Sequence, residues 1–455
     1  MKKTKSIFMI IILCINFAFV LFPSHADLKS YVNKPDPSYA YELVDTKEIE
    51  GCRAKVIHLT SQTWQGLTWN HLLLVICPPE AKNSDIAMLL VNGGSNKQKE
   101  PKLDSMEVKI ATMVSKKTNS VIAVLFQVPN QPIFEGKHED QIISYTYDKY
   151  LNGEGEDWPL LLPMVKSAVR AMDTIQLVQK DTDNQDIKRF VITGASKRGW
   201  TTWLTAATGD PRVVAIAPIV IDILNMRQQM LHQLECYGTF SSEIEDYTRL
   251  KIPQRMNTPK GEQLLGIVDP YSYRNAITIP KLVILGTNDP YWTVDSANLY
   301  FPDFPEPKYL CYQSNTKHDI NPTGIGTLAE FFLTVKNQKT FPSVSWKISK
   351  SNTITVNWNN PQGTAYLWKA DSDNRDFRNS KWESTQLKGE GKAKAKLKKP
   401  KTGWSAYYIE VRFPGSFGNS YSICTQMKVL PDKKYPFVID KQNFTAVPVN
   451  SSAKK

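Results

Sequence analysis

One serine, Ser196, occupies a position in the sequence that suits a catalytic nucleophile. A short strand expected over residues 189–192 runs into Gly194-Ala195-Ser196, and a helix-compatible stretch follows over 201–207. A strand, a Gly-x-Ser turn and a helix are the context of a nucleophile elbow, in which the turn lifts the serine hydroxyl above the sheet. The helix N-terminus offers N–H groups and a positive dipole end to a developing negative charge. The alternative is an ordinary strand–helix turn with a capping serine.

The elbow departs from the usual motif at one position. Arg198 stands two residues after the serine, where a small residue is usual, and Gly199 comes one position late. A bulky cation there could crowd the turn. It could instead point outward and hold an acidic group of a substrate.

An acid and a base follow the serine in the order that such hydrolases use. Asp289 follows the expected strand 281–285, and His318 follows a short strand over 309–312. The carboxyl ends of parallel strands are where open α/β sheets hold their sites. His318 would take the serine proton, and Asp289 would hold the imidazole tautomer.

Two other acids compete with Asp289. Asp222 ends the apolar run 213–221, and some hydrolases carry the acid one strand earlier. Asp295, in the loop beyond Trp292, is a weaker alternative. We favour Asp289 and keep Asp222 as the alternative acid.

The other histidines of the chain after residue 26 fit the role of base less well. His58 and His71 fall within an expected hairpin, while His138 and His232 adjoin the wrong elements.

A glycine-rich turn suggests an oxyanion hole. Asn92-Gly93-Gly94-Ser95 follows the apolar run 86–91. The backbone N–H groups of Gly94 and Lys197 could together bind an oxyanion, although Gly-Gly pairs are often plain turns.

Cofactor and metal motifs are missing from the sequence. There is no P-loop and no G-x-G-x-x-G, and histidines and cysteines are scattered along the chain. We therefore expect no cofactor and no metal site.

The elements that would position these residues alternate between strands and helices. Apolar runs typical of buried parallel strands are separated by helical patterns, notably over 161–178 and 323–339. The alternation predicts an α/β domain over 27–340, with an α/β-hydrolase-like, mostly parallel sheet and helices on both faces. Residues 225–275 are polar and break the alternation, and we expect an insertion that caps the site or else a plain surface excursion.

The pattern changes after Phe341. Short alternating or aromatic segments separated by turns predict a small all-β sandwich, of fibronectin III or immunoglobulin type, over 341–430. Residues 431–455 are rich in Lys, Ser and Asn, and we expect a flexible basic tail.

Residues 1–26 have the form of a secretory signal. Three lysines precede an apolar stretch, and small residues flank a cut before Asp27. The alternative is an uncleaved anchor, but the stretch is short of the roughly 20 residues that a span needs. No later segment is apolar enough to cross a membrane. We expect a periplasmic or secreted protein.

Positive charge is concentrated in the C-terminal quarter. Residues 27–340 hold 33 basic and 36 acidic side chains, net −3, whereas residues 341–455 hold 20 and 8, net +12. In an exported protein this predicts a separable module that binds an anionic surface or polysaccharide rather than nucleic acid. A solvated face that aids solubility would have the same composition.

Two cysteines suggest a disulfide. A hairpin centred near residues 64–66 would pair positions whose numbers add to 129–130, and Cys52 and Cys77 add to 129. We predict a Cys52–Cys77 bridge, against the alternative of two buried thiols.

With these residues assembled, the chain resembles the PhoPQ-activated pathogenicity-related protein family. The phrases VNGGSNK, TGASKRGWTTWL and GTNDPYW carry the resemblance, together with the Ser-Asp-His order. Glucuronoyl and related carbohydrate esterases resemble the elbow phrase too, including a cation after the serine. The resemblance implies an exported α/β-hydrolase-like domain followed by a fibronectin-like or immunoglobulin-like domain. Bacterial members are linked by name to virulence, and others are secreted repressors of proliferation.

The leading hypothesis is therefore an exported serine hydrolase of esterase or peptidase type, using Ser196, His318 and Asp289 on a substrate of unknown structure. Two alternatives remain open: a non-catalytic secreted signalling protein on a hydrolase scaffold, and an adhesion-like binding protein led by the basic β-domain.

Overall fold

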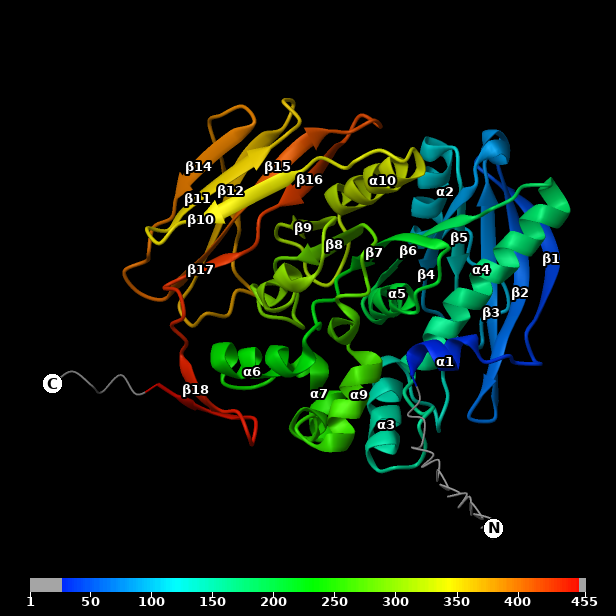
Figure 1. Ribbon diagram of the computed structural model, residues 1–455, viewed down its shortest axis with the longest axis horizontal. Coiled ribbons are helices and arrows are strands. Elements are labelled where there is room, and N and C mark those ends of the chain that lie inside the picture. Colours follow the sequence, from blue (N-terminus) through cyan, green and yellow to red (C-terminus); the bar gives the residue numbers. More distant parts are fainter. Residues whose placement is uncertain (1–26, 450–455) are drawn as a thin grey trace, which may run out of the picture.

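A nine-stranded sheet forms the centre of the larger half of the molecule. The computed structural model describes residues 27–449. Six neighbouring strands run parallel, and three antiparallel strands extend one edge of the sheet (Figure 1). In spatial order they are β1 (Ala40–Ile49), β2 (Cys52–Trp64), β3 (Leu67–Cys77), β5 (Val121–Leu125), β4 (Ile86–Val91), β6 (Arg189–Ala195), β7 (Val213–Ile219), β8 (Lys281–Gly286) and β9 (Lys308–Gln313).

Helices cover both faces of this sheet, as the sequence predicts for an α/β-hydrolase-like fold. Alternate residues of the apolar strands point to opposite sides, because successive side chains of a strand alternate. One face packs against α1 (Leu28–Asn33), α4 (Leu161–Asp183) and α5 (Lys197–Ala207). The other packs against α2 (Met106–Thr118) and α10 (Pro322–Lys336). The helix α3 (Glu139–Leu151) lies near the strand ends.

The predicted disulfide is wrong. Cys52 and Cys77 are free thiols, and they belong to the hydrophobic clusters on opposite faces of the sheet. The hairpin turns where the sequence predicts, but Cys77 pairs with Arg53, so the numbers of paired residues add to 130 at this end. A shift of one position turns a side chain to the other face, so Cys52 points away from Cys77.

The insertion over 225–275 is helical and lies between β7 and β8. Its helices are α6 (Met226–Tyr237), α7 (Glu245–Arg249), α8 (Ile252–Arg255) and α9 (Pro259–Val268). Together with α3 they lie beyond one end of the central strands (Figure 1).

The C-terminal strands form two antiparallel sheets. One contains β10 (Val344–Ile348), β11 (Thr353–Trp358) and β14 (Lys392–Lys396). The other contains β12 (Thr364–Ser372), β13 (Glu383–Gln386), β15 (Trp404–Pro414), β16 (Ser420–Cys424) and β17 (Lys428–Leu430). The sequence analysis missed β13 and β14. In β14 the three lysines face solvent and the two alanines between them are buried.

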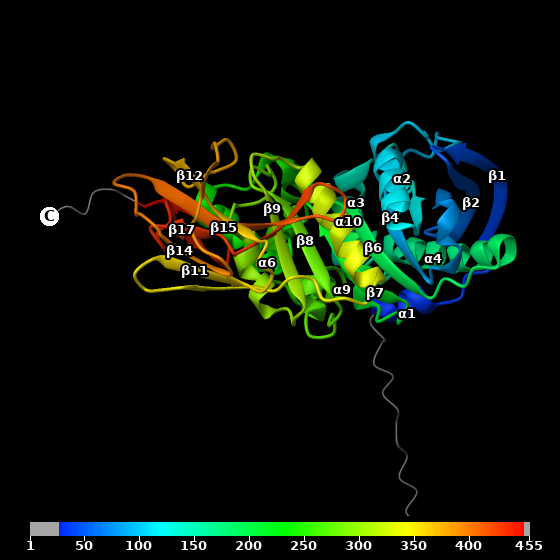
Figure 2. The ribbon, with the colours of Figure 1, turned by 90° about the horizontal axis from the view of Figure 1, so that it is seen from above.

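This β-sandwich, which the sequence predicts to be a separable module, packs directly against the α/β sheet. Figure 2 shows the two halves side by side along the long axis. The Ser422 N–H donates to Thr327 Oγ1 at 3.1 Å, and the rings of Tyr312 and Tyr408 lie 5.2 Å apart. Both hydrophobic clusters run from the sheet into the sandwich without a break.

The prediction of a loose tail is wrong for residues 437–448. They form a hairpin of β18 (Phe437–Asp440) and β19 (Thr445–Pro448). The Phe437 ring lies against Gly238 at the end of α6, where a Cβ would collide with it. The hairpin therefore braces the insertion.

Within residues 27–449, no helix combines the length and the apolarity that a bilayer crossing requires. The predicted signal over 1–26 lies outside the described residues.

Candidate active site

Ser196 occupies a strained turn between β6 and α5. Its φ of 57° and ψ of −127° lie in a region that non-glycine residues rarely adopt. Two glycines allow the turn, because a Cβ on Gly194 would lie 2.8 Å from the Arg198 carbonyl oxygen, and one on Gly199 would lie 2.9 Å from the Gly194 carbonyl oxygen. The sequence thus builds the sharp elbow that its Gly-x-Ser pattern predicts, with the second glycine one residue late.

His318 and Asp289 form a pair at the ends of β9 and β8. His318 Nδ1 lies 2.7 Å from Asp289 Oδ2, and Asp289 Oδ1 accepts a hydrogen bond from the Tyr291 N–H at 2.9 Å. The aspartate is 6% exposed. His318 Nε2 is buried and has no hydrogen-bond partner within residues 27–449. Of the candidate acids, the structure brings Asp289 to this histidine.

Tyr291 connects the histidine with the serine. Its ring stacks on the His318 imidazole with 4.4 Å between ring centroids, and it lines the same cavity as Ser196. Ser196 Oγ makes no hydrogen bond to His318 among the described residues. Catalytic contacts are often open in a free enzyme and tighten when substrate binds.

Asp222 is a buried acid near Asp289, and within the described residues it makes no hydrogen bond to a histidine. Burial is the main cause that raises its pKa to about 8, and the nearby Asp289 and Asp295 carboxylates add to the effect. Its Oδ1 has no hydrogen-bond partner in the described part of the chain. A carboxyl group with this pKa is mostly neutral at pH 7, and a neutral acid cannot orient and stabilise an imidazolium as a carboxylate does.

The two predicted oxyanion donors come from β4 and α5. Gly94 follows β4 with φ of +142°, and its carbonyl accepts a hydrogen bond from Gln131 Nε2 at 3.1 Å. Lys197 is the first residue of α5, where N–H groups have no carbonyl partner inside the helix. The Gly-Gly turn is also held by the Gln127 N–H, which donates to the Gly93 carbonyl at 2.8 Å.

Arg198 neither crowds the elbow nor points outward. Its guanidinium lies under the turn after β4 and forms a bidentate pair with Glu139, with N–O distances of 2.7 and 2.8 Å. Burial opposes ionisation of Glu139, but the Arg198 charge and hydrogen bonds outweigh it and lower the pKa of Glu139 to about 2. The expectation that Arg198 could hold an acidic substrate is therefore wrong, since its charge is already paired.

Lys197 is also paired. Its Nζ lies 3.1 Å from Glu139 Oε2 and 3.0 Å from Asp140 Oδ2, and Asp140 accepts a hydrogen bond from the Tyr247 hydroxyl at 2.8 Å. The sequence analysis missed this network. The adjacent acids Glu139 and Asp140, at the start of a helix, were the only signal in the sequence that could have pointed to it.

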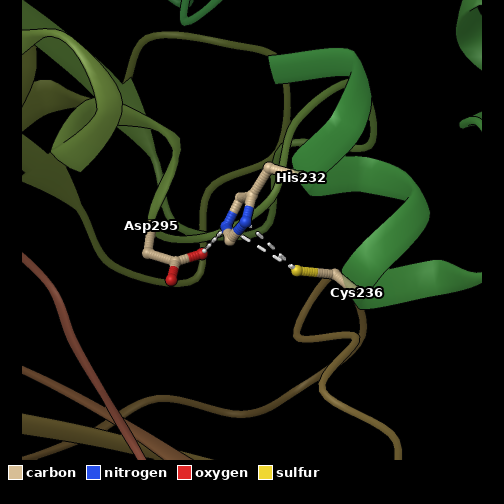
Figure 3. Close-up of side chains that lie close together, drawn as sticks. All are labelled: His232, Cys236 and Asp295. Carbon is tan, nitrogen blue, oxygen red and sulfur yellow. Dashed lines mark hydrogen bonds and ion pairs between the residues drawn. The ribbon is translucent and has the colours of Figure 1, made fainter. Parts of the chain in front are cut away.

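A second histidine lies in a buried charge cluster outside the serine site. His232 Nε2 lies 2.8 Å from Asp295 Oδ1 and 3.6 Å from Cys236 Sγ (Figure 3). These three side chains offer ligand atoms within 4.8 Å of one another, although the sequence predicts only scattered donors. Arg375, from the β-sandwich, donates to Cys236 Sγ at 2.6 Å and to Asp295 Oδ2 at 2.8 Å. A metal ion would have to displace this buried guanidinium, so the donor set does not favour one.

The comparisons with known proteins match most of the chain. The family model of the PhoPQ-activated pathogenicity-related protein matches residues 28–378. Autocrine proliferation repressor protein A of Dictyostelium discoideum is 32% identical over 449 residues, which cover 89% of each chain.

Among solved structures, an acetyl xylan esterase from Paenibacillus sp. R4 aligns with a TM-score of 0.48 at 12% identity, covering 69% of this chain and 92% of its own. Acetyl xylan esterase 1 from Thermoanaerobacterium aligns with a TM-score of 0.48 at 16% identity, covering 68% and 93%. The chain belongs to the PhoPQ-activated pathogenicity-related protein family.

Proposed function

We propose that the chain is a serine hydrolase that cleaves carboxylic esters. The observation that carries the proposal is the His318–Asp289 pair, which leaves Nε2 of the imidazole without a partner in the described residues, while Tyr291, whose ring lies against this imidazole, lines the cavity of Ser196. A general base needs one ring nitrogen held by an acid and the other free for the nucleophile's proton. Both ring nitrogens of the second histidine, His232, already have partners.

The proposed reaction follows from these roles. Ser196 Oγ attacks the ester carbonyl carbon while His318 Nε2 takes its proton. The backbone N–H groups of Gly94 and Lys197 stabilise the negative oxygen. His318 then gives the proton to the leaving alcohol, and water releases the acyl group from Ser196 by the same route in reverse. Asp289 keeps Nε2 free by accepting the Nδ1 proton in a hydrogen bond.

A fluorophosphonate probe on the purified protein tests the proposal directly, because it labels activated serines without knowledge of the substrate. We expect labelling of the wild type and of the Ser272→Ala control, an exposed serine on the insertion. Ser196→Ala should lose labelling without loss of folding. A wild type that neither reacts with the probe nor hydrolyses short esters would contradict the proposal.

The second candidate is a secreted signalling protein that does not use the serine. The printed name of the Dictyostelium relative, a proliferation repressor, favours it, as does the open contact between Ser196 and His318. A biological readout that Ser196→Ala retains in full would favour this candidate over hydrolysis.

Export and surface binding remain part of the proposal. The predicted signal over 1–26 supports a periplasmic or extracellular location, and the outward lysines of β14 support binding to anionic polymers. A separate lysine-lined hollow of about 310 Å³ beside Trp404 adds to this charge. Glutamine at the three β14 lysines should lower the salt concentration that elutes the protein from heparin. The same change at Lys97, Lys99 and Lys102 is the control, and equal elution of both variants would contradict surface binding.

A further inference from the structure

An apolar cavity opens beside Ser196, between the sheet and the insertion. Its free volume, for the centre of a water-sized sphere, is about 40 Å³. Two isoleucines after β7, Ile221 and Ile223, line it, as does Trp200, which follows the serine by one helical turn. The insertion contributes Met226 and Met230, which are four residues apart and so share a face of α6.

The charged groups at this cavity are already paired. Lys197 and Asp140 form an ion pair, and Asp140 also accepts from the Tyr247 hydroxyl. Trp292 Nε1, a neutral donor in the wall, lacks a partner among the described residues, so the wall offers neutral hydrogen-bonding groups but no free charge. A charged acyl group would lose its hydration here without gaining an opposite charge, which is costly.

We propose that this cavity is the acyl-binding site and that the substrate is an ester of a short, linear, apolar acid of about four to six carbons. The inference rests on the proposed function of Ser196. A cavity of this volume has room for more than a single water-sized group but not for a long acyl chain. Acetyl would leave part of the cavity empty. Two flexible methionines allow one or two further methylenes but not a long chain.

Chain length should therefore control the rate. Each methylene that enters an apolar site contributes about 0.8 kcal/mol, which corresponds to about fourfold in kcat/KM. We expect p-nitrophenyl butyrate or hexanoate to react at least tenfold faster than the acetate and the dodecanoate. A profile that is flat, or that falls steadily from the acetate, would overturn the inference.

Substitutions of Met230 test whether this cavity sets the profile. Met230→Phe should fill the space and move the optimum towards acetate, and Met230→Ala should move it to chains about two carbons longer. Met106→Ala is the matched control, since Met106 is 67% exposed on α2. Unchanged profiles in both Met230 variants would overturn the inference, and the alanine variant provides this test even if the phenylalanine variant does not fold.

Binding without reaction separates the two proposals. 1-Hexanol should bind to Ser196→Ala and change its tryptophan fluorescence, because Trp200 and Trp292 line the cavity. Ethanol should bind far more weakly, and Met230→Phe should bind hexanol at least tenfold more weakly. If no ester reacts but hexanol binds in this pattern, the proposed hydrolysis fails and the apolar site stands. If hexanol does not bind, the cavity inference fails whatever the esterase activity.

Discussion

His318 and His232 each pair with a buried aspartate at nearly the same distance, 2.7 and 2.8 Å, but their other contacts differ. His318 uses Nδ1 for the aspartate, and its Nε2 has no partner among the described residues. His232 uses Nε2 for Asp295 and lies against Cys236, with Arg375 closing the cluster. The first pair has a nitrogen to offer to a nucleophile, whereas the second is enclosed by charges.

The charges explain what each pair can do. Burial disfavours ionised His232, but Cys236 and Asp295 outweigh it and raise the pKa of His232 well above its usual value. Burial likewise opposes ionised Asp295, but Arg375 and His232 hold its pKa far below the usual range. The cluster joins α6, the loop after β8 and the β-sandwich. A histidine–aspartate contact in a fold therefore indicates catalysis only when the second nitrogen is free.

The largest expected effect is a difference in activity between variants of the two paired aspartates, Asp289 and Asp295. Asp289→Asn should lower kcat/KM for a short ester by about 10⁴-fold, because the imidazole loses its correct tautomer. Asp295→Asn should leave kcat/KM of the folded protein within a few-fold, and Asp222→Asn should also have a small effect. Ester hydrolysis normalised to the amount of folded protein, taken from circular dichroism, measures all three. A larger loss in Asp222→Asn would move the acid one strand earlier.

For stability we expect the opposite order, in which Asp295→Asn costs more than Asp289→Asn. Removing one partner of a buried ion pair typically costs about 3–5 kcal/mol, so Asp295→Asn should destabilise the fold strongly. Glu245→Gln is the control, because its pair with Arg249 is exposed and worth about 0–1 kcal/mol. Urea unfolding followed by tryptophan fluorescence measures the difference. Equal stability of the two variants would mean that the cluster is not a structural clamp.

A conservative change should weaken the cluster less. Arg375→Lys keeps the charge but cannot donate to Cys236 and Asp295 in the fork geometry of a guanidinium. We expect a loss of about 1.5–3 kcal/mol, the range for one hydrogen bond to a charged group. Unfolding in urea beside Asp295→Asn gives the ranking, and a lysine variant as unstable as the asparagine variant would argue against a role for the fork.

The last effect is a pH dependence and concerns Asp222, which lies near the carboxylates of both pairs. Its folded pKa of about 8 is raised, so its stabilising contribution is complete below about pH 4 and is lost as the pH rises to 8. Relative to Asp222→Asn, the wild type should therefore lose up to about 1.4 kcal/mol per pH unit over this window. Urea midpoints at pH 5 and pH 8 measure it, and parallel curves would contradict a buried neutral acid.

Local signals in the sequence were enough for much of the fold and for the geometry around Ser196. The elbow, the strand before Asp289 and the loop with His318 each follow from a short apolar run and its turn residues. The strand β14 is missing from the predicted elements. Its Lys-Ala alternation has the period of two that marks a half-buried strand, but its small alanines give a weak apolar signal.

Contacts between distant segments gave no such signal. Arg375 reaches Cys236 and Asp295 from the sandwich, and no spacing in the sequence relates Arg375 to either position. The Cys52 prediction failed through a register shift of a single residue, which depends on hairpin geometry rather than on residue types.

The β18–β19 hairpin has a consequence for the order in which the protein matures. A chain is made from its N-terminus, so the segment that braces α6 leaves the ribosome long after α6 itself. Asn257 of the insertion also donates to the Lys441 and Gln442 carbonyls at the hairpin turn, both at 3.2 Å. The helix that carries Met226 and Met230 is therefore held by this hairpin only after residues 437–448 have been made, about two hundred residues after the helix itself.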